Sequence, residues 1–246
     1  DQPRSRGLGD VYKRQAPILA LENVSLSHAG RELRGVSFAA YAGRVTALIG
    51  PINAGKTSIL RILLNLETPS SGQILICGKP YIRLDDPKTA VAAVPTTIPH
   101  SSYCSAGTYL RWKALWSGAP DTHLNHVVQM TGLQSVLSCK LKALTVIDTV
   151  KIRFAVALLS NPKALIMDEP FQGLDQRSTA WVQEQIRKQA NRGVAMLISS
   201  EPDERVESIA DDVVILNRGM VTREGSLGQL RNNHDTLRQF FPSLHD

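Results

Sequence analysis

The stretch GPINAGKTS at residues 50–58 combines residue types and a spacing that suit the binding of a phosphate chain. Gly50, Gly55, Lys56 and Thr57 match the pattern G-x-x-x-x-G-K-[ST]. In such a loop, backbone N–H groups at a helix N-terminus hold phosphate oxygens, the lysine adds a positive charge, and the threonine hydroxyl ligates Mg²⁺. The pattern predicts a phosphate-binding loop made of Gly50, Pro51, Ile52, Asn53, Ala54, Gly55, Lys56, Thr57 and Ser58.

Two residues of this loop, Ile52 and Asn53, stand where a small polar residue and a glycine are expected. Phosphate loops need unusual backbone angles, and asparagine tolerates the left-handed region better than other non-glycine residues. Ile52 only has to point away from the phosphates. We therefore expect the loop to bind.

A second group of reactive residues ends the segment ALIMDE at 164–169, which reads as an apolar strand followed by two carboxylates. Asp168 suits the coordination shell of Mg²⁺ together with Thr57, and Glu169 suits a general base that polarises an attacking water. An acidic strand end is unremarkable alone. Together with the loop, it predicts hydrolysis of a phosphate anhydride.

The elements that position these residues alternate between strand and helix. RVTALIG (44–50) has the continuous apolar pattern of a buried strand and leads into the loop. A helix is expected over 57–66, with one apolar face made of Ile59, Ile62, Leu63 and Leu66. Further strands are expected at 18–27, 31–41, 73–78, 89–95, 163–170, 193–199 and 212–219.

Residues 97–158 have helical patterns without obvious strands. Candidate helices lie at 106–118 and 121–133, and Asp121 is the expected N-cap of the second. The sequence therefore predicts an α/β core that is split by a helical insertion. The first two strands read as a pair around a turn at Ala29-Gly30. The expected parts are a non-native tail at 1–15, a domain at 16–230 with its core at 16–96 and 159–230 and its helical subdomain at 97–158, and a C-terminal tail at 231–246.

The bulk composition excludes some classes of function. The 246 residues carry a net charge of +6 without dense Lys/Arg runs, so nucleic acid is not expected as a partner. No apolar run approaches the ~18–20 residues that a membrane span needs. Three widely spaced cysteines without a metal-binding pattern favour a reduced, cytoplasmic protein.

The order of the motifs resembles the nucleotide-binding ATPase subunit of an ABC transporter. The resemblance covers residues 18–230 and depends on the loop, NPKALIMDEPFQGLD (161–175) and ILNRGMVTREGSLGQL (215–230). It implies a P-loop NTPase fold with a RecA-like core, an N-terminal antiparallel β part and an inserted helical subdomain, and ATP and Mg²⁺ as cofactors. It also implies a homo- or heterodimer, in which Gly173–Asp175 touch the partner subunit, on the cytoplasmic face of a separate integral-membrane permease subunit. His28 matches the family's aromatic residue that stacks on adenine.

The chain departs from that family at positions that close the site. The family signature Leu-Ser-Gly-Gly-Gln aligns with residues 144–148, LTVID, where Thr145 can imitate the serine. Branched Val146 and Ile147 cannot imitate glycines, and Asp148 has the wrong charge beside a phosphate. A family glutamine is replaced at Thr96-Thr97, and a family histidine by Glu201. We therefore expect ATP binding with slow hydrolysis.

Three functions fit these features. The first is an ATPase subunit that drives a permease, and the segment LRWKALWSGAP (110–120) suggests an exporter of drugs or antibiotics. The alternative is a degenerate, non-hydrolysing nucleotide-binding partner with a regulatory role. The third, an ABC-type protein acting on ribosomes or DNA, is disfavoured because those proteins usually carry two ATPase units or a long coiled coil.

Overall fold

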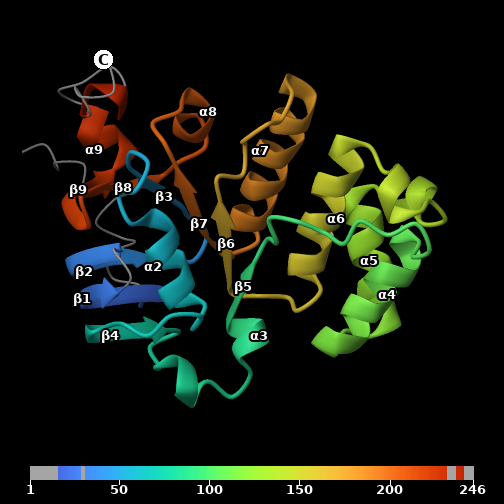
Figure 1. The fold of residues 1–246 in the computed structure, drawn as a ribbon, viewed down its shortest axis with the longest axis horizontal. Helices are drawn as coiled ribbons and strands as arrows, with labels where there is room; N and C mark the ends of the chain where they lie inside the picture. The colour runs from blue at the N-terminus through green and yellow to red at the C-terminus, as the bar shows by residue number, and fades with distance from the viewer. Residues whose placement is uncertain (1–15, 29–30, 232–236, 241–246) are drawn as a thin grey trace, which may run out of the picture.

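The computed structural model describes residues 16–28, 31–231 and 237–240, and it contains two β-sheets (Figure 1). The expected tail at 1–15, the turn at Ala29-Gly30 and most of the expected tail at 231–246 lie outside the described residues. The expected division into core and helical subdomain stays a prediction.

The smaller sheet has three antiparallel strands in the order β2-β1-β4. Leu19 lies opposite Ala40 on one side and opposite Ile76 on the other, so β1 is the central strand. This sheet is the antiparallel N-terminal part that the sequence predicts. Its strands are β1 (Leu19–His28), β2 (Arg31–Ala40) and β4 (Ser71–Ile76).

The larger sheet has six strands in the order β5-β6-β7-β3-β8-β9. Every neighbouring pair is parallel except β8 and β9, which are antiparallel. The α/β fold class is therefore confirmed. The strands are β3 (Val45–Ile49), β5 (Val91–Ala93), β6 (Ala164–Asp168), β7 (Ala195–Ser200), β8 (Asp212–Asn217) and β9 (Met220–Ser226).

The strand β3 is buried on both faces, and its side chains alternate between two apolar cores. Leu48 packs with helix α2 (Lys56–Leu63) and the small sheet, whereas Ile49 packs with the helices on the opposite face. The expected apolar face of α2 is buried at Ile59, Ile62 and Leu63. The prediction for Leu66 was wrong: α2 ends at Leu63, so Leu66 lies beyond the helix and is 63% exposed.

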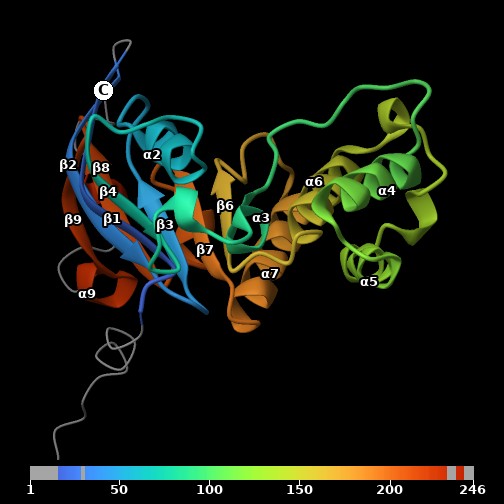
Figure 2. The same ribbon diagram turned by 90° about the horizontal axis from the view of Figure 1, so that it is seen from below.

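The helices α4, α5 and α6 lie beside one another at the end of the molecule away from the small sheet (Figures 1 and 2). Asp121 is the first residue of α5 and Pro120 is its N-cap, which corrects the expected cap by one residue. No helix in the described part of the chain is long and apolar enough to cross a membrane. The helices besides α2 are α3 (Pro87–Ala90), α4 (Ala106–Ser117), α5 (Asp121–Thr131), α6 (Val146–Leu158), α7 (Gln176–Asn191), α8 (Glu204–Glu207) and α9 (Leu227–Arg231).

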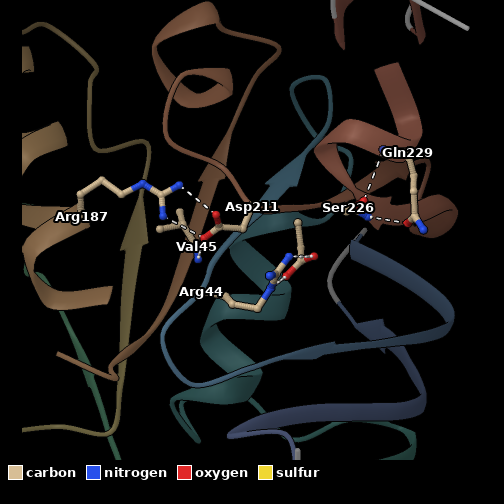
Figure 3. A network of polar contacts seen from close by, with 7 residues as sticks. Arg44, Val45, Arg187, Asp211, Ser226 and Gln229 are labelled. Atoms are coloured by element: carbon tan, nitrogen blue, oxygen red, sulfur yellow. Dashed lines mark hydrogen bonds and ion pairs between the residues drawn. The ribbon is translucent and has the colours of Figure 1, made fainter. Parts of the chain in front are cut away.

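Two arginine–aspartate pairs hold the amino ends of the central strands (Figure 3). Arg44 binds Asp212 at the start of β8 through Nε and Nη2, at 2.5 and 2.6 Å. Arg187 of α7 binds both carboxylate oxygens of Asp211 at 2.9 and 3.0 Å, and Asp211 also accepts the Val45 N–H at 2.8 Å. These bidentate contacts fix the sheet at the edge opposite the carboxyl ends of β3 and β6.

Candidate functional site

The predicted phosphate-binding loop lies between β3 and α2, at the carboxyl edge of the large sheet, where open α/β sheets bind ligands. Gly55 is the N-cap of α2 with a φ of 105°, and no side chain caps the helix. The N–H groups of the first turn of α2 therefore remain available for an anion. This open helix terminus fits a polyphosphate.

One of the two unusual residues of the loop, Asn53, takes the conformation that the sequence predicts. Asn53 has a φ of 63°, in the left-handed region. Ile52 is 74% exposed and is one of the residues that line the adjoining cavity, so the expected direction of its side chain stays a prediction. Gly50 is required by close packing, because a Cβ there would lie 2.4 Å from the Leu216 carbonyl oxygen.

Lys56 is buried and bent back over the loop. Its Nζ donates to the carbonyl oxygens of Gly50 at 2.7 Å and Pro51 at 3.1 Å, and lies 3.4 Å from Oε1 of Glu169. Those contacts hold the ammonium group at the carboxyl edge, between the loop and the end of β6.

The two predicted Mg²⁺ ligands are in direct contact. Thr57 Oγ1 donates to Oδ2 of Asp168 at 3.1 Å, and Ser199 of the intervening strand β7 donates to Oδ1. A hydroxyl and a carboxylate side by side are oxygen ligands of the kind Mg²⁺ prefers, so the pair fits that ion. Ser199, which sequence reasoning missed, positions the carboxylate.

Glu169 follows β6 with a φ of 44°, an unusual angle for a residue with a side chain. Its N–H donates to the carbonyl oxygen and to Oγ of Ser199, at 3.1 and 3.2 Å, which holds this conformation. Burial raises the pKa of Glu169, and the nearby Lys56 ammonium opposes that rise only in part. A raised pKa suits a group that accepts a proton near neutral pH.

A cavity of about 1000 Å³ opens in front of the loop. It is bordered by the loop residues 52–58, by Glu169 and by the segment from Ser200 to Arg205. The backbone of His28 ends β1 opposite Arg31, whereas its side chain lies outside the described structure. Glu32, close to that position, does line the cavity. No sequence pattern pointed to Glu32, Phe171 or Arg205, because long-range packing brings these residues to the cavity.

Of the described positions outside the loop that depart from the family pattern, one lines the cavity and the others do not. Glu201 lines the cavity, and its backbone N–H bonds the Glu169 carboxylate. Residues 96–97 and 144–148 are absent from the described lining of the cavity. Thr145 is the N-cap of α6: its Oγ1 accepts the Asp148 N–H at 3.2 Å and donates to the Asp148 carboxylate at 2.5 Å. The first turn of α6 is therefore capped from within the chain.

Comparisons with known proteins agree with this geometry. The family model for ABC transporters matches residues 33–172, more than half of the chain. The spermidine/putrescine import ATP-binding protein of Spiroplasma citri is 26% identical over 89% of this chain, which spans 65% of that relative's length. The lantibiotic transport ATP-binding protein of Streptococcus pyogenes is 28% identical over 84% of this chain and 90% of its own length.

A solved ATP-binding subunit of an ABC transporter is 27% identical, with a TM-score of 0.76, over 91% of this chain and 93% of that one. The TM-score shows that this solved subunit and the present chain have the same overall fold. The chain belongs to the ABC transporter family and has the fold of its P-loop NTPase domains.

Proposed function

We propose that this chain binds MgATP and hydrolyses it slowly to drive a separate membrane permease. The observation that carries this proposal is the uncapped N-terminus of α2, with Lys56 and Glu169 on the same cavity. The loop residues 50–58 hold the phosphates, and Lys56 neutralises the outer ones. Thr57 and Asp168 ligate Mg²⁺, and Glu169 orients the attacking water.

Slow turnover is supported by the first turn of α6. In the family dimer, this segment of one subunit closes over the outer phosphate that is bound to the other. Here Val146 is 62% exposed and presents a branched side chain, while Asp148 places a carboxylate at the helix terminus. The same feature favours the alternative function, a regulatory partner that binds nucleotide without hydrolysing it.

The permease surface that we propose is the outer face of α4. Leu115 and Trp116 are 75% and 70% exposed, and Trp112, one turn earlier, is 52% exposed. Adjacent exposed apolar side chains of this size mark an interaction surface. The subunit then sits peripherally on the cytoplasmic face, where ATP is available. The name of the Streptococcus relative, a lantibiotic transport protein, supports an antibiotic as the transported class.

Equilibrium titration with MgATP tests the proposal. Lys56→Ala should weaken binding at least about ten-fold, because it removes a charge-assisted contact from a buried site. The matched control is Lys188→Ala, which removes a lysine that pairs with exposed Glu184 on α7. Equal affinities of the wild type and Lys56→Ala would refute the assignment of the loop.

A further inference from the structure

The cavity in front of the loop contains an arginine as well as Lys56. Among the described residues that line it, Lys56 and Arg205 are the cationic ones, whereas four are carboxylates: Glu32, Glu169, Glu201 and Asp203. A nucleoside triphosphate remains an anion even with Mg²⁺ bound. Its outer phosphates therefore need more positive charge than Lys56 alone supplies, and Arg205 is placed to supply it.

Arg205 is held in one orientation by its neighbours. Its Nε lies 3.0 and 2.8 Å from the two carboxylate oxygens of Asp203, and Nη2 lies 2.5 Å from Oδ2. Nη1 donates to the Phe171 carbonyl oxygen at 3.0 Å, and the guanidinium carbon lies 5.7 Å from the Phe171 ring centroid. These bonds use Nε–H and one N–H on each terminal nitrogen, and each terminal nitrogen has a second N–H.

Arg205 interacts electrostatically with Glu169, the proposed general base. The hydrogen bond to Asp203, together with the negative charges of Asp203 and Glu169, raises the pKa of Arg205. Glu169 also contacts Lys56 at 3.4 Å, so its carboxylate interacts with both cations of the cavity. A water oriented by Glu169 attacks the outermost phosphorus, so the Glu169 side of the cavity is where the γ-phosphate ends.

We propose that Arg205 binds the γ-phosphate of ATP, with Asp203 and the Phe171 carbonyl group as its positioning partners. This inference rests on the proposed function of the site. A planar guanidinium with two N–H groups suits phosphate oxygens, and its charge offsets one of the carboxylates that line the same cavity. Arg205 therefore makes the site selective for ATP over ADP, because ADP lacks the phosphate that the guanidinium contacts.

The test is equilibrium titration of the full chain with MgATP and, separately, MgADP. In Arg205→Gln, the affinity for ATP should fall at least about ten-fold relative to the affinity for ADP. Arg205→Lys keeps the positive charge but lacks the planar guanidinium, so the ratio of its affinities for ATP and ADP should lie between those of the wild type and Arg205→Gln. Arg187→Gln is the matched control, because it breaks an Arg–Asp pair outside the cavity and should leave the ratio unchanged.

The outcomes separate this inference from the proposed function. Loss of ATP affinity with ADP affinity kept supports a γ-phosphate contact. A parallel fall of both affinities with a lower Tm would show that Arg205 only joins α8 to the segment after β6, and this would overturn the inference. An unchanged ratio in Arg205→Gln overturns it as well, while the proposed function stands. A wild type that binds neither nucleotide overturns both.

Discussion

Lys56 and Glu169 form an ion pair across the candidate site, with Nζ 3.4 Å from Oε1. The same ammonium group also donates to two carbonyl oxygens of the loop. A phosphate chain bound at α2 competes with Glu169 for this ammonium group, because both are anions. Nucleotide binding and the ion pair of the proposed general base, Glu169, are therefore coupled through the side chain of Lys56.

Glu169→Gln should keep or strengthen the affinity for MgATP, because Lys56 loses its competing anion, and should lower the rate of hydrolysis by about 10²-fold or more. Glutamine has the same shape but cannot accept the proton of the attacking water. Phosphate release at saturating MgATP, together with an equilibrium titration, measures the two effects. Glu184→Gln on the exposed face of α7 is the control. A Glu169→Gln protein as active as the wild type would mean that the base lies elsewhere.

The raised pKa of Glu169 makes stability depend on pH. Because the folded pKa lies above the unfolded one, the folded protein holds this proton more tightly. The associated stabilisation is present below the unfolded pKa and is lost as the pH rises through the folded pKa. The free energy of unfolding of Glu169→Gln minus that of the wild type should therefore increase with pH across this window, then level off. Urea denaturation over a pH series measures this difference. If the difference is the same at every pH, the pKa is not raised.

Gly50→Ala should destabilise the fold by about 1–3 kcal/mol, which is typical of overpacking. The new Cβ would lie 2.4 Å from the Leu216 carbonyl oxygen and 2.9 Å from the Ala54 Cβ, and backbone cannot move away as easily as a flexible side chain. Gly228→Ala in α9 is the control, since nothing lies within 4 Å of its added Cβ. Urea denaturation compares the two variants, and equal stabilities would contradict the close approach of β8 to the loop.

The sequence predicted those features that local preferences decide. Asn53 was expected in the left-handed region because of its own side chain, and the α/β alternation followed from apolar runs. Arg205 could not be found this way, because its place in the cavity depends on how α8 packs beside the end of β6. Leu66 was misplaced because the apolar period continues past the point where α2 ends. Such errors come from tertiary packing, which a one-dimensional pattern does not contain.

The last prediction concerns the capped turn at residues 144–148. If the family dimer forms from two copies, both sites face this turn, and its branched side chains and carboxylate obstruct both outer phosphates. A heterodimer offers this chain's loop an intact signature on its partner. Even then, the site lacks the family's glutamine and histidine, which lie on the same chain as the loop. We therefore expect turnover by the isolated chain well below the usual range of ~1–10³ s⁻¹.

Restoring the family residues should raise the rate of ATP hydrolysis, although it weakens helix α6. The substitutions are Thr145→Ser, Val146→Gly, Ile147→Gly, Asp148→Gln and Glu201→His. Two glycines in the first turn of α6 cost less than about 1 kcal/mol each, because they replace β-branched residues at the helix terminus, so the Tm should fall modestly while hydrolysis increases. Adding Glu169→Gln to this variant should trap an ATP-dependent dimer, which size-exclusion chromatography with MgATP detects. Adding Lys56→Ala instead should abolish both effects, because the loop no longer holds ATP. Brisk hydrolysis by the unmodified chain would contradict an obstructing role for residues 144–148 and would mean that Val146, Ile147 and Asp148 turn away from the nucleotide.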